Sequence, residues 1–479
     1  MRVESGQLYI DGGFREAADG GRADVINPAT GEAVGSMAQG GAADARAGVA
    51  AAAEAFASWA ATPAPERAAV LRRAAERILE RRDAIAALMT LEQGKPLREA
   101  SGEVAMTADY FQWNAEEARR IYGDLIPAST RGKRLLVLRQ PVGVTAAITP
   151  WNFPASMIGR KLAPALAAGC TAVVKPAPAT PLVACAIFQC LHDAGLPAGV
   201  ANLVAGPAEP IGEVFLTDPR VRKISFTGST AVGKMLLGRA AAQMKKVSLE
   251  LGGHAPFLVF ADADLDQAVE GVVSSRFRNA GQTCICANRL YVQRDIAAAF
   301  SERLVARVRS LKVGRGDDPA VDVGPLIGQA AIERVRAQVE DGLARGGRLL
   351  CGGGALPGPG YFFEPTVLAD LPPEALLRHQ ETFGPLLGLW SFQDEAEAVR
   401  LANDTPYGLA AYLYTRDLGR AVRVSEALEY GIVGVNDPVP ATVQAPFGGV
   451  KESGMGREGG YEGVLGFLET KFVSLAVPS

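Results

Sequence analysis

The feature of this sequence that most constrains its fold is an alternation of short apolar runs with helical segments, which begins at residue 142. Apolar runs of this length are typical of buried strands, and strands that alternate with helices form parallel sheets. We therefore expect a doubly wound α/β fold with two lobes that meet near residue 251. The runs expected as strands are 142–148, 171–175, 201–205, 222–227, 246–251, 256–260, 288–292, 408–414 and 431–436.

Helical periodicity predicts long helices both before residue 142 and between the strands. The second of the early helices should end at Gly94, since glycine commonly closes a helix. The expected helices are 43–61, 66–93, 99–120, 181–194, 209–216, 230–241, 264–280, 296–311, 329–345 and 417–428.

Two further segments, RLLVLRQ at 134–140 and FLETKFVSL at 467–475, look like exposed strands. An exposed strand carries unpaired backbone groups that tend to bind another chain. We expect these two segments to form contacts between subunits of a homo-oligomer, either a dimer or a tetramer.

Composition excludes two kinds of partner. The chain has 49 Lys and Arg against 52 Asp and Glu, a net charge of −3, which argues against a nucleic-acid partner. The longest nearly apolar run, 162–174, is too short to span a bilayer, and the N-terminus lacks the apolar segment of a secretory signal. We therefore expect a soluble, cytoplasmic protein with no membrane partner.

Histidine and cysteine counts narrow the chemistry further. The three histidines, His192, His254 and His379, are too far apart for an H-E-x-x-H zinc motif, and we expect no metal. The six cysteines form no C-x-x-C pair and no disulfide framework, which fits a reducing compartment.

The segment Gly228–Lys234 follows an expected strand and opens an expected helix, as a phosphate-binding P-loop does. Met235 stands where a P-loop needs Ser or Thr to bind Mg²⁺, so a P-loop nucleotide binder is only a remote alternative. The segment is either a helix N-terminus suited to a phosphate or a plain turn between strand and helix.

Cys284 lies in FRNAGQTCIC, where small and polar neighbours predict a loop that a ligand can approach. It is either an inert thiol or a nucleophile. Cys286 would point to the opposite side of an extended segment, and we interpret it as a small buried hydrophobe. A strained redox pair between these two residues is the alternative.

Four other polar residues stand at positions that suit a site. Glu250 and Lys175 end apolar strands, where open α/β sheets bind ligands, although Glu250 could also be a turn residue. Asn152 lies between two prolines that would fix its amide for an oxyanion hole, or it satisfies a turn. Glu381 in ETFGP is a further candidate, with an exposed loop carboxylate as the alternative.

Seven motifs in order, PWNFP, KPA, FTGST, ELGG, GQTC, ETFGP and PFGGVKESG, resemble the aldehyde dehydrogenase superfamily along essentially the whole chain. The runs KVSLELGGHAPFLVF, FRNAGQTCICANRLYVQ and ALEYGIVGVN are especially similar to the bacterial succinate-semialdehyde dehydrogenase branch. The resemblance implies a Rossmann-type cofactor domain, an α/β catalytic domain and a small β oligomerisation element.

The resemblance also implies a domain division. Residues 1–120 and 141–250 would form the cofactor-binding domain, and 251–460 the catalytic domain. Residues 121–140 and 461–479 would form the oligomerisation element.

The resemblance further implies a mechanism. Cys284 would attack the aldehyde and form a thiohemiacetal and then a thioester, with Asn152 and the Cys284 backbone N–H stabilising the oxyanion. Glu250 would activate water to hydrolyse the thioester, which distinguishes the chain from CoA-acylating relatives. The cofactor would be NAD or NADP, because Pro178 neither repels nor binds a 2′-phosphate. The implied cofactor-binding residues are Pro150, Trp151, Lys175, Pro178, Gly228, Ser229, Leu251, Glu381 and Phe383.

A semialdehyde that carries a distal carboxylate requires cationic side chains near the reacting carbon to bind that carboxylate. Arg160 and Arg278 match the carboxylate-binding arginines of succinate-semialdehyde dehydrogenases, with a surface or ion-paired arginine as the alternative for each. Ala441 stands where those enzymes tend to have Ser, and the neighbouring Thr442 is a third candidate. Succinate semialdehyde is the expected substrate, and glutarate semialdehyde, 2-oxoglutarate semialdehyde or a glycolaldehyde-type substrate are alternatives.

Overall fold

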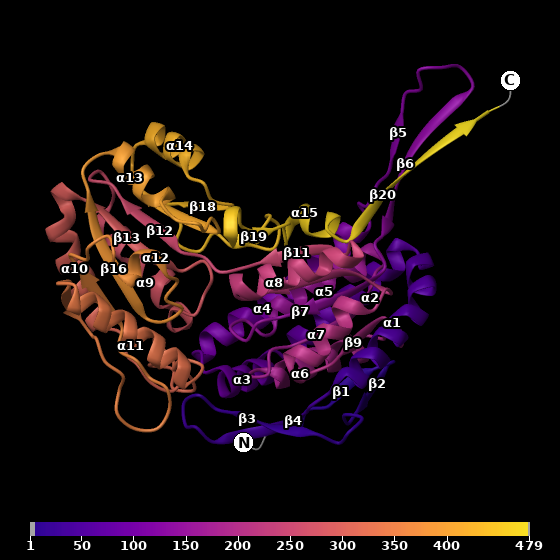
Figure 1. Ribbon diagram of the computed structural model, residues 1–479, viewed down its shortest axis with the longest axis horizontal. Coiled ribbons are helices and arrows are strands. Elements are labelled where there is room, and N and C mark those ends of the chain that lie inside the picture. Colours follow the sequence, from indigo (N-terminus) through magenta and orange to yellow (C-terminus); the bar gives the residue numbers. More distant parts are fainter. Residues whose placement is uncertain (1–4, 478–479) are drawn as a thin grey trace.

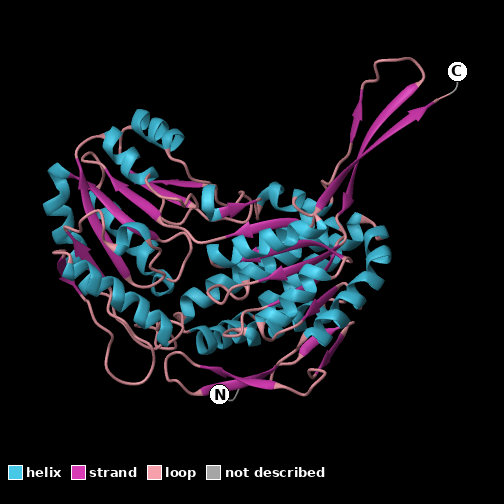
Figure 2. Ribbon diagram, viewed as in Figure 1, coloured by secondary structure: helices cyan, strands magenta, loops and turns pink. Residues whose placement is uncertain are grey.

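The computed structural model describes residues 5–477, which form two helix-covered sheets and a small third sheet that projects from the body (Figure 1). Residues 1–4 and 478–479, the ends of the predicted cofactor domain and oligomerisation element, lie outside the described residues. Figure 2 shows strands enclosed by helices in both larger bodies, as the predicted α/β class requires.

The first large sheet has the strand order β19-β11-β10-β7-β8-β9-β1-β2. The strands from β11 to β9 run parallel, whereas β19, β1 and β2 pair antiparallel at the edges. Chain order reverses between β7 and β10, so the connections leave these neighbours in opposite directions. The strands are β1 (Leu8–Ile10), β2 (Gly13–Arg15), β7 (Val144–Ile148), β8 (Thr171–Lys175), β9 (Ala201–Leu203), β10 (Val221–Thr227), β11 (Lys246–Glu250) and β19 (Gly454–Met455).

Helices cover this sheet, and one expectation for them is wrong. The single helix expected over 66–93 is two helices, because Arg81 leaves helical geometry at φ −104° and ψ 12°. Arg81 stands in a run of charged residues with no Gly or Pro to mark the break. The helices are α1 (Ala42–Ala61), α2 (Ala64–Glu80), α3 (Arg82–Gln93), α4 (Leu97–Ala118), α5 (Ser156–Ala168), α6 (Pro181–Asp193), α7 (Ala208–Thr217) and α8 (Thr230–Ala240).

The second large sheet has the order β14-β15-β16-β13-β12-β17-β18 and is parallel except for β14. The sequence did not indicate β15 and β16, which follow a stretch rich in Gly and Pro. The elements are β12 (Ala255–Val259), α9 (Leu265–Phe277), β13 (Ala287–Gln293), α10 (Ala297–Arg309), α11 (Gln329–Ala344), β14 (Arg348–Cys351), β15 (Thr366–Ala369), α12 (Leu376–His379), β16 (Leu386–Phe392), α13 (Glu395–Asn403), β17 (Ala410–Tyr414), α14 (Leu418–Ala427) and β18 (Ile432–Val435).

The helix expected over 264–280 is also too long. Helix α9 ends at Phe277, and Asn279 and Ala280 adopt left-handed backbone angles with φ of 51° and 53°. Such angles are uncommon outside glycine and often occur at functional sites. This tight turn carries the chain from α9 into the loop that holds Cys284.

The third sheet contains β5 (Asp124–Ile126), β6 (Lys133–Pro141) and β20 (Leu468–Ala476), all antiparallel. It projects from the body beside the C-terminus (Figure 1) and exposes 70% of Leu125 and 60% of Phe472. The two exposed strands expected from the sequence therefore exist and pair with each other. The short helix α15 (Gly460–Leu465) precedes β20 but packs against α5, and the hairpin of β3 (Arg22–Ile26) and β4 (Ala33–Ala38) was not expected.

No helix in the described part of the chain combines the length and the apolar character that crossing a membrane requires.

The C-terminal cap of α3, Gly94, leads to a prediction about stability. Gly94 has φ of +96°, and a Cβ there would lie 2.6 Å from Cγ of Pro325 and 2.9 Å from Cγ of Pro28. Gly94→Ala should therefore lower the free energy of unfolding by about 1–3 kcal/mol and lower the Tm in scanning calorimetry.

The matched control is Gly102→Ala inside α4, where a Cβ would meet no described atom within 4 Å. That change should raise stability by about 0.5–1 kcal/mol, because alanine is the better helix former. A Gly94→Ala protein with a Tm at or above that of the wild type would contradict the packing described for this turn.

Candidate active site

The loops that leave the first sheet at its order reversal face the loops that enter the second sheet. The first set follows β7 and β10, the second precedes β13 and β16, and the segment between β11 and β12 joins the two sheets. A cavity of about 740 Å³ lies between them. The predicted site residues that line it are Pro150, Trp151, Asn152, Gly228, Ser229, Leu251, Cys284, Glu381 and Phe383.

The other predicted site residues stand outside the lining of this cavity. Glu250 and Lys175 are buried at strand ends, and Arg160 is buried in α5. Pro178 and Thr442 lie in loops. Arg278 begins the turn after α9.

Cys284 is half-buried in the loop before β13. Burial raises the pKa of its thiol to about 12, although the nearby Arg160 guanidinium opposes this shift. A glycine must stand opposite, because a Cβ at Gly253 would come within 2.4 Å of the Cys284 carbonyl oxygen. The ELGG motif therefore makes room for the thiol loop.

Cys286 is a small buried residue, the first of the two alternatives given for it. It is 1% exposed, its sulfur accepts a hydrogen bond from Arg276 Nη1 at 3.2 Å, and its S–H faces the Gly281 carbonyl oxygen at 3.2 Å. Both Cys284 and Cys286 are free thiols in this structure.

Asn152 lies beside the thiol loop. Its side-chain Nδ2 donates to the backbone oxygen of Gln282 at 3.0 Å, two residues before Cys284. Its own backbone oxygen accepts hydrogen bonds from Lys95 Nζ at 2.8 Å and Asn279 Nδ2 at 3.0 Å. Neither Lys95 nor Asn279 was identified from the sequence. The only signal for Lys95 is a lysine in EQGKP, the short connection between α3 and α4.

Glu250 ends β11 fully buried, and within the described residues neither of its carboxylate oxygens has a hydrogen-bond partner. Burial, and then the Glu458 carboxylate, raise the pKa of Glu250, while Lys161 and Arg160 lower it. Lys161 Nζ forms a buried ion pair with Glu458. A raised pKa makes the Glu250 carboxylate a stronger base, which suits the role of a general base.

Lys161 and Glu458 were not identified from the sequence. Lys161 is buried in α5, a helix that is buried throughout, and a lysine in such a setting signals a specific partner. A glycine is needed close by, because a Cβ at Gly448 would lie 2.8 Å from Glu250 Oε1.

The opposite end of the cavity suits a dinucleotide. Ser229 caps α8, so the helix N-terminus opens into the cavity beside Gly228, where a phosphate binds well. Glu381 Oε1 accepts the Gly253 N–H at 3.0 Å, and burial raises the pKa of Glu381 to about 7. Thr227 lines the same wall, and its buried hydroxyl lacks a partner among residues 5–477.

Lys175 and Lys234 differ in the partners that their ammonium groups already have. Lys175 ends β8, donates to the Pro176 oxygen at 3.1 Å, and has its pKa lowered to about 8 by burial. Lys234, the lysine of the P-loop alternative, pairs with Glu452 Oε1 at 2.7 Å, away from the phosphate-binding end of α8. The helix also begins at Thr230, which leaves no long loop to wrap a triphosphate.

The predicted substrate arginines are held differently. Arg160 Nε donates to the Tyr110 hydroxyl at 3.0 Å, and its guanidinium lies 4.0 Å from the centre of the Phe447 ring. In the part of the chain that is described, Arg160 Nη1 and Arg278 Nε are buried without a partner. Thr442 instead is half-buried in its loop and bonds to Gln444.

The histidines bond elsewhere in the fold. His192 Nδ1 lies 3.2 Å from the Tyr9 hydroxyl, His254 Nε2 lies 3.1 Å from the Arg378 oxygen, and His379 Nε2 lies 2.7 Å from the Pro373 oxygen. The described residues contain no group of three or more His, Cys, Asp or Glu placed to hold a metal ion.

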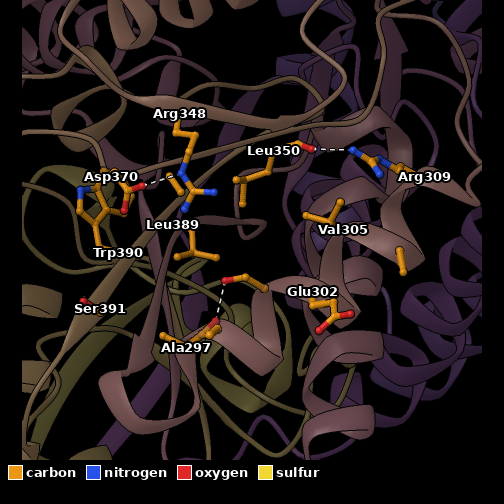
Figure 3. A pocket seen from close by; sticks show the side chains of 14 residues that line it. Ala297, Glu302, Val305, Arg309, Arg348, Leu350, Asp370, Leu389, Trp390 and Ser391 are labelled. Carbon is orange, nitrogen blue, oxygen red and sulfur yellow. Dashed lines mark hydrogen bonds and ion pairs between the residues drawn. The ribbon is translucent and has the colours of Figure 1, made fainter.

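A second cavity of about 820 Å³ lies on the outside of the second sheet, between α10 and the edge formed by β14, β15 and β16 (Figure 3). Arg348 pairs with Asp370 at its rim, and Arg309 bonds to the Leu350 oxygen. It contains none of the predicted site residues, so the smaller cavity is the candidate active site.

Burial of Cys284 predicts how the cofactor-free protein reacts with iodoacetamide. Only the thiolate is alkylated, and its fraction grows with pH until the pKa is passed. With that pKa at about 12, the rate should rise about tenfold per pH unit between pH 6 and 9. Peptide mass mapping should place the label on Cys284.

Cys286→Ala should keep the labelling, and Cys284→Ser should lose it. A rate that reaches a plateau below pH 8 would contradict the raised pKa of the Cys284 thiol.

Comparison with known proteins identifies the family. The aldehyde dehydrogenase family profile matches residues 14–473. The NADP(+) succinate-semialdehyde dehydrogenase of Escherichia coli is 52% identical over 471 residues, and the glutarate-semialdehyde dehydrogenase of Pseudomonas putida is 51% identical over 471 residues, each match covering 98% of both chains. A crystal structure described as an E. coli NADP dependent enzyme superimposes with a TM-score of 0.97 at 52% identity and covers 98% of both chains. The chain therefore belongs to the aldehyde dehydrogenase family.

Proposed function

We propose that this protein oxidises succinate semialdehyde to succinate with NAD⁺ or NADP⁺. The observation that carries the proposal is the pairing of a half-buried thiol, Cys284, with the amide of Asn152 in one cavity that has a helix N-terminus at its other end. This arrangement fits an aldehyde at one end and a dinucleotide at the other.

In the proposed mechanism Cys284 gives its proton to solvent water and the thiolate attacks the aldehyde carbon, so a C–S bond forms and the carbonyl oxygen becomes an oxyanion. Donors aimed at that oxygen stabilise the charge where it develops. Asn152 Nδ2 and the Cys284 backbone N–H are the proposed donors. When bound, the nicotinamide cofactor supplies the hydride acceptor that converts the thiohemiacetal into a thioester.

Glu250 completes the cycle as the proposed general base. Its carboxylate takes a proton from a water molecule, the resulting hydroxide attacks the thioester carbon, and the C–S bond breaks to release the acid and the Cys284 thiolate. The adjacent Lys161–Glu458 pair supports this role. The Glu458 carboxylate raises the pKa of Glu250 and so makes it a stronger base, while the Lys161 ammonium opposes that shift.

The residues proposed to hold the cofactor fit its chemistry. Gly228 and Ser229 at the start of α8 suit the diphosphate, and Lys175 and Glu381 suit the ribose hydroxyls. Pro178, at the turn after β8, carries neither an acid nor a donor toward a 2′-phosphate. The E. coli relative is named for NADP, and both cofactors stay in the proposal.

A distal carboxylate on the substrate is supported by Arg160 Nη1 and Arg278 Nε, two buried donors that lack an acceptor within residues 5–477. The Nε atom of Arg160 is already engaged by the Tyr110 hydroxyl at 3.0 Å and lies 3.9 Å from Glu458 Oε2. Glutarate semialdehyde is the second candidate, because the P. putida relative named for it is nearly as similar as the succinate-semialdehyde enzyme. Thr442, half-buried on the loop before PFGG, is the proposed contact for the far end of a longer substrate.

The predicted domain division belongs to the same proposal. The first sheet would carry the cofactor, the second sheet would carry Cys284, and the projecting sheet of β5, β6 and β20 would bind a second copy of the chain. The strand β19 comes from the range 251–460 yet pairs with β11, so the chain crosses back to the first sheet before its end. The unpaired cysteines fit a reducing cytoplasm.

The proposal is tested by purified protein with each cofactor and a matched set of aldehydes: succinate semialdehyde, glutarate semialdehyde and uncharged butanal. Reduced nicotinamide should form fastest with a semialdehyde. Arg278→Met should raise the KM for succinate semialdehyde by about 10- to 100-fold, since a charged hydrogen bond contributes about 1.5–3 kcal/mol.

The KM for butanal serves as the internal control and should change less than about threefold, a loss below one neutral hydrogen bond. Failure of every aldehyde with both cofactors would overturn the proposed function. An equal rise in both KM values would overturn the role of Arg278 alone.

A further inference from the structure

The two proposed oxyanion donors come from segments that no secondary-structure element joins. Asn152 follows β7 in the first sheet, whereas Cys284 precedes β13 in the second. The amide and the Cys284 N–H must nevertheless hold a fixed separation, since a displacement of about 1 Å can cost up to 100-fold in rate. Some other group must set that separation.

Lys95 reaches the Asn152 side of this gap from the short connection between α3 and α4. It is 1% exposed, and its ammonium donates to the Asn152 backbone oxygen at 2.8 Å and to Glu103 Oε2 at 2.5 Å. It also lies 4.0 Å from the centre of the Phe153 ring. Glu103 Oε1 accepts the backbone N–H groups of Ala155 at 2.9 Å and Ser156 at 3.2 Å.

The buried pair therefore binds the turn after β7 through both of its members. Lys95 donates a hydrogen bond to a backbone carbonyl of the turn, and Glu103 accepts hydrogen bonds from two backbone N–H groups. Burial lowers the pKa of Lys95, and Glu103 opposes that shift. Removing both charges from water costs free energy. A turn alone would not require that cost, because a neutral donor could satisfy the one carbonyl that Lys95 binds.

Asn279 spans the gap itself. Its left-handed backbone, with φ of 51°, turns its side chain toward the first sheet. Nδ2 donates to the Asn152 backbone oxygen at 3.0 Å and lies 3.3 Å from the Gln282 oxygen, which also accepts the Asn152 amide. Gln93 locks this side chain: its Nε2 donates to Asn279 Oδ1 at 2.9 Å, and its Oε1 accepts the Lys95 N–H at 3.0 Å.

We infer that Lys95 and Asn279 are positioning residues that fix the Asn152 amide relative to the Cys284 loop and so build the oxyanion site. The inference rests on the proposed function. Neither residue lines the cavity, so each acts through the Asn152 peptide. The same contacts hold the amide ready to turn from the Gln282 oxygen toward an oxyanion without moving the backbone.

Three variants test the inference. Lys95→Met removes the ammonium, and Lys95→Met with Glu103→Gln removes it without leaving a buried unpaired carboxylate. Asn279→Gly removes the bridging amide at a position where glycine accepts the positive φ. Even if the lysine variants fail to fold, Asn279→Gly tests the inference independently.

Arg98→Met is the matched control. Arg98 lies three residues from Lys95 and likewise joins a backbone oxygen, that of Val321 at 2.7 Å, to a carboxylate, that of Asp322 at 3.0 Å. It touches neither Asn152 nor the Cys284 loop in the described contacts. Its removal should leave the rate of thioester formation within about twofold of the wild type.

The primary readout is the first-turnover rate of reduced cofactor formed from succinate semialdehyde by saturated enzyme. Each test variant should lower it by about 10- to 100-fold. Alkylation of Cys284 by iodoacetamide forms no oxyanion, so its rate should stay within about threefold in the lysine variants. In an Asn152→Ala background, the same substitutions should cost less than about threefold, because no amide is left to position.

Full additivity with Asn152→Ala would overturn the inference, and so would equal losses in alkylation and turnover, which would indicate general disruption. A wild type that oxidises none of the aldehydes would overturn the proposed function first. A working wild type with additive variants would overturn the positioning role alone.

Discussion

The rest of this structure depends on the reversal of strand order between β7 and β10. Neighbouring parallel strands whose connections leave in opposite directions open a crevice at their carboxyl ends, where open α/β sheets bind ligands. The loops after these strands carry Asn152 on one side and Gly228 and Ser229 on the other. The second sheet presents the loops that enter β13 and β16, with Cys284 and Glu381, to the same crevice.

The site between the two sheets contains charged groups that are buried away from water, and two ion pairs lie next to it. Lys95 with Glu103 and Lys161 with Glu458 are all nearly inaccessible to water. Such pairs contribute little net stability, so their concentration around Asn152 and Glu250 points to function. One pair holds the backbone carbonyl of Asn152, the proposed oxyanion donor, through Lys95. The other lies beside Glu250, the proposed base, whose pKa is raised first by burial and then by Glu458 and is lowered by Lys161.

Sequence reasoning reached the residues that belong to contiguous motifs. Cys284 and Asn152 lie in short patterns of small, polar and proline residues, and the structure brings them to one cavity. Lys95, Asn279, Lys161 and Glu458 could not be found this way, because their partners lie far away in the sequence.

The errors in the fold have a similar origin. The break at Arg81 lies within a charged run that carries no Gly or Pro, so helical periodicity continues through it in the sequence. The end of α9 at Phe277 is set by the left-handed turn at Asn279, which tertiary contacts to Gln93 and Asn152 hold in place. Local pattern cannot report either constraint, whereas the projecting strands could be predicted because each is a single contiguous segment.

If the acyl group passes through Cys284 and is released by water that Glu250 activates, removal of the base should trap it on the enzyme. The measurement is the intact mass of Glu250→Gln protein, quenched in acid after mixing with succinate semialdehyde and cofactor. A succinyl thioester should accumulate on Cys284, located by peptide mapping, while the wild type carries little of it. No acyl adduct, or an adduct on any other residue, would rule out this route.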